Sequence, residues 1–450
     1  MEERNLGTTT TIKAQPQQPS EDSLVHAKIG DRSIWGIYIA LLIISIIESY
    51  SASSREIVST GLGIYMPIIK HILMLGAGAV VLFLLQRTHY RKFIPFIAVF
   101  AFITIIFMII ALFIGDNING AKRSFTIMGI SIQPAEMAKL SIVALIAWIM
   151  ARSQMEKGVK TVGLAWSAFF VMVYGGLLFQ QGLTNTILLM SISLSMMVIG
   201  GVQWRKLGTT ILIYMLFAGG LLGLKMMNDE KEDMMKAAKT EMVAQDGSDD
   251  TTAPAQSGRG STWAARLDRF TSSKPLVEQP LNSINQQEIF ARMAQAHGGV
   301  TGVGPGNSRE CSRLPLAFSD YIYSIIIEET GVVGGIFVLF LYLCLLARAG
   351  LIAKKCSRAF PALLIMGMAV MVTFQAMFHM AINTGLFPVS GQPLPLISRG
   401  GTSILITSMA FGVMISVSRF AVQNNKSKDI KSEASQLPEN LRASNPVQID

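Results

Sequence analysis

The sequence predicts an all-α polytopic membrane protein with ten transmembrane helices and one large extracytoplasmic loop between spans 7 and 8. Hydrophobic residues make up 51% of the 450 residues and charged residues only 15%, against roughly 25% charged residues in soluble domains. The apolar residues also come in blocks that reach the ~20 residues needed to cross a bilayer as a helix. These observations exclude a disordered protein, a small disulfide-rich scaffold and an ordinary soluble enzyme.

Ten blocks have the length and composition of membrane-spanning helices. The fifth and sixth are separated by only three residues, so we expect them to form a tight helical hairpin. The blocks cover residues 34–52, 63–85, 93–114, 133–152, 162–179, 183–201, 208–226, 320–347, 360–383 and 402–420.

The distribution of basic residues predicts the orientation of the chain. The loops after spans two, four, six and eight hold twelve Lys and Arg residues, whereas the short loops on the other side hold four, namely Arg55, Lys122, Arg123 and Arg399. Cytoplasmic loops carry the excess of Lys and Arg, so both termini are expected in the cytoplasm. The net charge of +9 then reflects membrane orientation rather than binding of nucleic acid.

The chain is expected to fall into five parts. The N-terminal part has no apolar segment that would suit a cleavable signal peptide, so the first span is expected to act as an uncleaved anchor. The parts are a disordered cytoplasmic tail (1–32), spans 1–7 (33–226), the large extracytoplasmic loop (227–319), spans 8–10 (320–420) and a cytoplasmic tail (421–450). Within the large loop, residues 263–270 suit a helix that lies on the membrane surface.

Asp320 is the leading candidate for chemistry, because it stands where the large outer loop meets span eight. A carboxylate at the mouth of an apolar span is partly desolvated, which makes it a better general base near neutral pH. The alternative role is that of a helix N-cap, for which Asp is a favoured residue. The two roles do not exclude each other.

Of the other charged residues within the predicted spans, three are the next candidates, because charge there is costly and marks either function or pairing. Glu136 and Lys139 open span four at a spacing of three, which places them on one helix face. They either neutralise each other or line a polar cavity that holds an anionic headgroup. Glu328 follows Asp320 by eight residues and is expected to face the same way, unless it is the structural partner of a buried Arg or Lys.

Three cations on the outer side need a partner there. Lys122 and Arg123 precede span four, and Arg399 precedes two glycines at the start of span ten. Backbone N–H groups at a helix start suit an anion, and contact with lipid headgroups is the alternative role for these side chains. Residues 383–403 are rich in Gly and Pro yet apolar, which predicts a re-entrant loop buried in protein or lining a cavity.

Together these segments resemble the SEDS family of bacterial cell-wall synthesis, typified by FtsW, RodA and SpoVE. The ten-span layout with one large outer loop before span eight is also similar to that family. The turn that ends at Ser308 resembles the division branch, FtsW, more than the elongation branch, RodA. The matching stretches are residues 120–123, 133–140, 298–308, 320–331 and 385–403.

The resemblance implies a peptidoglycan glycosyltransferase that polymerises lipid II at the outer face of the cytoplasmic membrane, in septal wall synthesis. The donor would be glycan on undecaprenyl pyrophosphate, and the acceptor the GlcNAc 4-hydroxyl of the next lipid II. Asp320 matches the family's catalytic Asp, as general base or as ligand of a divalent cation, Mg²⁺ or Mn²⁺, and no organic cofactor is expected. The implied partners are a class B penicillin-binding protein and other division proteins.

Substrate contacts are expected around Asp320. Charge and side of the membrane predict that Arg123, Lys139 and Arg399 hold pyrophosphate. The full set of substrate-binding candidates is Lys122, Arg123, Glu136, Lys139, Gln287, Ser308, Glu328, Ser398 and Arg399.

The chain departs from the family pattern at several positions, most of which lose a usual polar partner. Ser124 stands for a Trp, Leu316 and Phe318 for a Glu and a His, His379 for an Asn, and Arg399 for a Tyr. The anion role of Arg399 is therefore an inference from its charge and not from the resemblance.

Two other functions remain open from the sequence. A lipid II flippase or transporter would use intramembrane charges and a site near the midplane, whereas Arg123, Asp320 and Arg399 cluster at the outer face. A non-catalytic division scaffold would tolerate the substitution Asp320→Ala.

Overall fold

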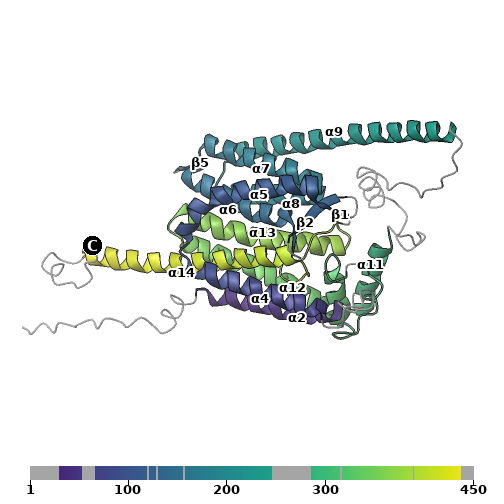
Figure 1. Ribbon diagram of the computed structural model, residues 1–450. Coiled ribbons are helices and arrows are strands. Elements are labelled where there is room, and N and C mark those ends of the chain that lie inside the picture. The colour runs from purple at the N-terminus through teal and green to yellow at the C-terminus, as the bar shows by residue number, and fades with distance from the viewer. Residues whose placement is uncertain are drawn as a thin grey trace, which may run out of the picture.

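The computed structural model of the protein describes residues 30–52, 66–118, 121–127, 130–155, 158–245, 285–314, 317–388 and 390–436. Long helices lie side by side in one bundle (Figure 1). The helices are α2 (Arg32–Ala52), α4 (Met66–Arg87), η1 (Tyr90–Phe93), α5 (Ile94–Ile114), α6 (Pro134–Arg152), α7 (Thr161–Gln181), α8 (Leu183–Ile199), α9 (Trp204–Gln245), α11 (Gln286–Gly298), α12 (Ile322–Lys355), α13 (Ala359–Asn383) and α14 (Gly401–Gln436).

The helical membrane fold predicted from the apolar blocks is confirmed. Within the described ranges, nine helices are long and apolar enough to cross a membrane, and α8, with 17 residues, is a shorter apolar helix. All ten lie where the sequence predicted spans. Gly182 alone separates α7 from α8, as the predicted hairpin requires, while the count of ten crossings stays a prediction because α8 is short.

Three helices continue well beyond the predicted ends of their spans, and one of them, α12, ends at Lys355 rather than near residue 347. α9 runs on to Gln245 and α14 to Gln436, and the two project past opposite ends of the bundle (Figure 1). The predicted boundaries at residues 226 and 420 therefore fall inside continuous helices, and the C-terminal tail is helical as far as Gln436. Residues 1–29, and the surface helix predicted at 263–270, lie outside the described residues.

A small antiparallel sheet between α5 and α6 was not predicted. It consists of β1 (Asp116–Ile118), β2 (Ala121–Ile127) and β3 (Ile130–Ile132) in the order β1-β2-β3. Strand pairing satisfies the backbone groups of this connection locally, and Phe125 of β2 packs edge-on against Phe107 of α5 at 5.7 Å. A second, two-stranded ladder, β4 (Gln154–Met155) with β5 (Gly158–Val159), follows α6.

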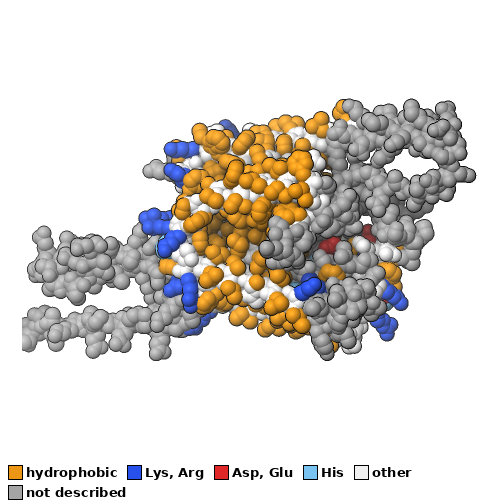
Figure 2. All heavy atoms as spheres, viewed as in Figure 1, with side chains coloured by type: hydrophobic (Ala, Val, Ile, Leu, Met, Phe, Trp, Pro, Cys, Tyr) orange, Lys and Arg blue, Asp and Glu red, His pale blue; other side chains and the backbone are white. Residues whose placement is uncertain are grey.

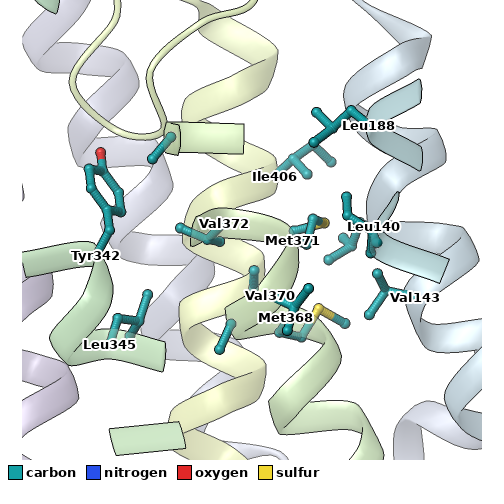
Figure 3. Close-up of a cluster of buried hydrophobic side chains, with 14 of the residues drawn as sticks. Leu140, Val143, Leu188, Tyr342, Leu345, Met368, Val370, Met371, Val372 and Ile406 are labelled. Carbon is teal, nitrogen blue, oxygen red and sulfur yellow. The ribbon is translucent and has the colours of Figure 1, made fainter. Parts of the chain in front are cut away.

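The centre of the bundle consists of α6, α13 and α14, which are mostly buried, whereas α4 and α9 lie at its periphery. Buried hydrophobic side chains of the central helices and their neighbours lie in the space between these helices (Figure 3). The side chains labelled there are Leu140 and Val143 of α6, Leu188 of α8, Tyr342 and Leu345 of α12, Met368, Val370, Met371 and Val372 of α13, and Ile406 of α14.

Small residues allow α4 and α14 to approach closely. A Cβ atom on Gly412 would lie 3.1 Å from the Cα atom of Leu82, and one on Gly78 would lie 2.6 Å from Ser408 Oγ. In a bilayer such close packing replaces the hydrophobic effect as the force between helices. Larger residues at either glycine would push the two helices apart.

Apolar side chains cover the middle of the visible face of the bundle, and Lys and Arg side chains gather along one of its ends (Figure 2). The same asymmetry is found along the chain, because α4, η1, α6 and α12 all carry basic residues in their last turns. We call this the basic end. It is the end predicted to face the cytoplasm.

Asp31 ties three helices together at the basic end. Its Oδ1 atom accepts hydrogen bonds from the backbone N–H groups of Ser33 and Ile34 at the start of α2. Its Oδ2 atom accepts from Arg348 of α12 at 2.7 and 2.9 Å, and its own N–H donates to Ser418 Oγ of α14. Burial opposes ionisation of this carboxyl, but the hydrogen bond and charge of Arg348 outweigh it, so the pKa of Asp31 is lowered.

Replacing this carboxylate should reduce stability in a pH-dependent way. A lowered folded-state pKa contributes stability above the unfolded-state value, and that contribution is lost as the pH falls through the folded-state pKa. Asp31→Asn keeps the helix cap but loses the ion pair with Arg348; we expect it to cost about 1–2 kcal/mol at pH 7, a difference that shrinks below about pH 4. Thermal melting in detergent at several pH values would measure it, with Lys354→Gln as the control. A difference that grows on acidification would contradict this assignment.

Candidate active site

Asp320 lies on a short non-helical turn just before α12. The helix begins at Ile322 and its N-cap residue is Tyr321, so the N-cap role considered for Asp320 is not observed. Its Oδ1 atom accepts a hydrogen bond from Ser319 Oγ at 3.0 Å, and the side chain is half-buried. The carboxylate is therefore partly desolvated, as the sequence predicted.

The last loop holds this turn by its backbone. The N–H of Arg399 donates to the carbonyl oxygen of Phe318 at 2.9 Å, and Ser398 Oγ donates to that of Ser319 at 2.7 Å. The guanidinium of Arg399 lies over the Phe318 ring, 5.2 Å from its centre. The structure thus brings the predicted residues Asp320, Ser398 and Arg399 together.

The last loop is folded into the protein, as expected for a re-entrant segment. Leu394, Leu396 and Ile397 are fully buried. Tyr342 of α12 donates its hydroxyl hydrogen to the carbonyl of Pro395 at 2.6 Å. Such anchoring from inside the bundle gives the loop a fixed shape from which Ser398 and Arg399 reach the Asp320 turn.

A buried polar network lies against the other side of the same loop. Lys139 Nζ donates to Glu136 Oε1 at 2.6 Å and to Gln375 Oε1 of α13 at 2.7 Å. Gln375 Nε2 in turn donates to the carbonyl of Pro393 at 3.1 Å. Glu136 and Lys139 thus form the self-neutralising pair that their spacing allowed, and Gln375 links that pair to the loop.

Sequence reasoning missed three polar residues of this region. Besides Gln375, Gln392 of the loop donates to Asn185 Oδ1 of α8 at 2.6 Å. All three are buried. For Asn185 and Gln375, a polar side chain inside a predicted span was the signal that could have identified them, whereas Gln392 lies in the loop between spans and gave no such signal.

Glu328 belongs to a different part of the structure than Asp320. Its carboxylate accepts hydrogen bonds from Ser308 Oγ at 2.5 Å and from the backbone N–H groups of Arg309 and Glu310. The expectation that it faces the same way as Asp320 is wrong, because α12 begins only at Ile322 and helical spacing does not extend back to Asp320. The pair Glu328–Ser308 fastens the outer loop to α12.

The glycine-rich turn at 298–306 forms backbone hydrogen bonds with a break in α12. Gly331 has a φ of +74°, and a Cβ atom there would lie 2.1 Å from the carbonyl oxygen of Val300. On either side of this break, Val303 and Gly304 donate to the carbonyls of Glu328 and Glu329, and Val332 donates to Gly299. The turn therefore pairs with α12 through backbone hydrogen bonds at its break, a contact that we call the splice.

The structure places the remaining candidates, Lys122, Arg123 and Gln287, less completely. Lys122 and Arg123 belong to β2 rather than to a loop, and their side chains lie outside the described residues. Thr402 at the start of α14 accepts from the N–H of Gln133 and donates to the carbonyl of Ser131, which joins this sheet region to the last loop. Gln287 lies half-buried in the first turn of α11.

Within the described ranges, no group of three or more His, Cys, Asp or Glu side chains is placed to hold a metal ion. Mg²⁺ is often bound by one or two carboxylates together with substrate phosphates. The residues present fit an ion only in that way, with Asp320 as a single protein carboxylate.

The sequence matches the cell cycle protein family FtsW/RodA/SpoVE over residues 31–242 and 253–423. The chain belongs to this family. A probable peptidoglycan glycosyltransferase FtsW of Xanthomonas oryzae is 29% identical over 360 residues, which are 78% of this chain and 65% of that protein. The stage V sporulation protein E of Bacillus subtilis is 26% identical over 362 residues, 78% of this chain and 87% of that protein.

Solved structures of this family share the fold. The rod shape determining protein RodA of Thermus thermophilus superposes with a TM-score of 0.57 at 20% identity, covering 86% of this chain and 96% of that one. A chain from a peptidoglycan synthase complex that coordinates polymerization and crosslinking superposes with a TM-score of 0.61 at 22% identity, covering 87% and 98%.

Phe318 and His379, two of the departures from the usual FtsW/RodA/SpoVE pattern, have partners in the structure. Phe318 supplies the ring beneath Arg399, and Ser124 is buried in β2. The Nδ1 atom of His379 lies 2.6 Å from the carbonyl oxygen of Gln392. Leu316 lies outside the described residues. The departures at Phe318 and His379 are thus accommodated by local contacts of their own.

Breaking the Glu136–Lys139 pair on one side should be more harmful than removing it whole. A buried charge left without its partner costs about 3–5 kcal/mol, whereas replacing both charges by neutral groups is often tolerated. We expect Lys139→Met to lower the melting temperature in detergent strongly, and Glu136→Gln/Lys139→Met to recover much of the loss. The exposed Lys160→Met serves as the control, and a double variant less stable than Lys139→Met would contradict the pairing.

Proposed function

We propose that this chain is a peptidoglycan glycosyltransferase that polymerises lipid II into glycan strands at the outer face of the cytoplasmic membrane, in septal wall synthesis during cell division. The observation that carries the proposal is the turn with Asp320, held by the same loop that presents Ser398 and Arg399. The names of the related FtsW proteins as probable peptidoglycan glycosyltransferases support it.

The arrangement suits transfer of a sugar from a pyrophosphate leaving group. Asp320 accepts the proton of the GlcNAc 4-hydroxyl as that oxygen attacks the anomeric carbon of the donor sugar. The bond from the anomeric carbon to the pyrophosphate oxygen breaks, and undecaprenyl pyrophosphate leaves with the electron pair. A carboxylate fixed by its backbone and only partly solvated suits this general-base role.

Charge distribution supports the assignment of pyrophosphate binding. The charge of Lys139 is neutralised by Glu136 within hydrogen-bond distance, so Lys139 contributes little attraction for an anion. Arg399, on the loop beside Asp320, is the better candidate. Lys122 and Arg123 of β2 are further cations, on the same predicted outer side of the membrane. A bound Mg²⁺ or Mn²⁺ would offset further negative charge of the pyrophosphate.

The proposed orientation places the basic end in the cytoplasm and both termini on that side. Asp31 contacts Arg348 late in α12, whereas Asp320 precedes the first turn of the same helix. The two therefore lie at opposite ends of α12, which puts the Asp320 turn toward the outside. A class B penicillin-binding protein and other division proteins are the proposed partners, in line with the synthase complex that shares the fold.

Polymerisation of purified lipid II tests the proposal directly. Wild type and Asp320→Asn would be compared in detergent with the cognate penicillin-binding protein and Mg²⁺ or Mn²⁺, after subtraction of the partner's own background. We expect glycan formation by the wild type and a loss of about 10²-fold or more in the variant, the contribution of a general base.

Glu288→Gln on α11 is the matched control, since it makes the same carboxylate-to-amide change outside the candidate site. It should retain wild-type activity. Equal product from Asp320→Asn and wild type would remove Asp320 from the chemistry. No product from wild type with its partner bound would overturn the transferase assignment in favour of transport or scaffolding.

A further inference from the structure

The carbonyl oxygen of Asp320 itself is held by a residue that sequence reasoning did not select. Asn383, the last residue of α13, donates from Nδ2 to this oxygen at 3.0 Å and to the carbonyl of His379 at 2.9 Å. The Asn383 side chain is only 2% exposed. Three successive carbonyls, those of Phe318, Ser319 and Asp320, are therefore held from outside the turn.

A directed chain of hydrogen bonds extends from Asn383 to the outer helix α11. Asn383 Oδ1 accepts from Ser324 Oγ at 3.0 Å, and Ser324 Oγ accepts from Gln295 Nε2 at 2.8 Å. Gln295 Nε2 also donates to the backbone carbonyl of Asn383 at 2.7 Å. Three helices, α11, α12 and α13, thus meet at this one side chain.

The network fixes the orientation of the Asn383 amide. A reversed amide would turn its oxygen toward the carbonyls of Asp320 and His379, and its NH₂ group toward the hydroxyl of Ser324. Only the observed orientation gives every donor an acceptor. Asn383 is therefore restrained on both sides before any substrate arrives.

The restraint matters because the direction of the Asp320 carboxylate follows from its own backbone. The turn is not helical, so no i→i−4 hydrogen bonds hold it. A carbonyl left without a partner in this partly buried region would cost at most about 1–3 kcal/mol and would draw the turn toward a new partner. A displacement of about 1 Å in a catalytic group can lower the rate about 10²-fold.

We propose that Asn383 is a positioning residue for Asp320, and that Ser324 and Gln295 make this position depend on α11. The kinetic part of the inference rests on the proposed transferase function. In this role Asn383 makes no contact with substrate. It fixes the direction of the Asp320 carboxylate. A shift of α11 would change that direction through Gln295, Ser324 and Asn383.

Steady-state kinetics of lipid II polymerisation test the positioning role. We expect Asn383→Ala to lower kcat about tenfold or more with the KM for lipid II unchanged. Gln295→Ala should show a smaller loss of the same kind, since it removes the chain at its outer end. Thr384→Val is the matched control, because its hydroxyl only bonds carbonyls of its own helix and its loss should leave kcat unchanged.

Hydrogen–deuterium exchange gives a readout that does not depend on activity. Asn383→Ala should speed exchange of the backbone amides between residues 317 and 325, while the control leaves them as in the wild type. Because Asn383→Ala can fail to fold, Gln295→Ala, whose side chain is half-buried, provides the second test of the same chain.

The outcomes of these experiments distinguish the positioning role of Asn383 from the proposed transferase function. Exchange and kcat equal to those of the control would overturn the positioning role, and so would a loss confined to KM. A wild type that makes no glycan would overturn the proposed function, while the exchange data would still decide whether Asn383 restrains the turn.

Discussion

Irregular backbone within the bundle must find its hydrogen-bond partners inside the protein, and this constraint shapes the region around Asp320. The last loop leaves helical geometry between α13 and α14, and its carbonyls at Gln392, Pro393 and Pro395 are taken up by side chains of His379, Gln375 and Tyr342. Once held in this way, the loop can itself supply donors to the Asp320 turn. The order of anchoring runs from the central helices to the loop and from the loop to the carboxylate.

The same constraint distinguishes charged residues that stabilise the structure from those that are available for chemistry. Glu136 and Lys139 neutralise each other in the interior, and Glu328 is taken up by Ser308 and backbone N–H groups. These charges hold elements together and are poorly placed to meet a ligand. Asp320 and Arg399 stand instead on irregular segments, where side chains are positioned by backbone bonds made by their neighbours. A site of this kind can be rigid although it lies on loops.

Much of the fold could be predicted from the sequence because apolar length alone defines a membrane helix. The predicted spans and the observed helices differ mainly at the C-terminal extensions of α9, α12 and α14, where a change in hydropathy does not end a helix. Asp320, Ser398 and Arg399 could be selected from their position at helix starts. The sheet of β1–β3 was missed because β1 and β3 have only three residues each, too few for a recognisable alternation of apolar and polar residues.

Other features could not be derived from one sequence because they depend on which helices meet. Asn383 and Gln295 are ordinary polar residues until α11, α12 and α13 are packed together. The spacing argument for Glu328 failed for a local reason, since the helix it assumed does not extend back to Asp320. Spacing predicts a shared face only inside one continuous helix.

The splice at Gly331 has a consequence for how this protein tolerates sequence change. The bonds that join residues 299–304 to α12 are made by backbone atoms, so they do not depend on which side chains the turn carries. Gly298, Gly302 and Gly331 are the exception, because a Cβ atom at any of them would lie within 2.2 Å of a carbonyl oxygen across the splice. Exposed positions of this segment such as Thr301 should therefore tolerate substitution, whereas these three glycines should tolerate no other residue.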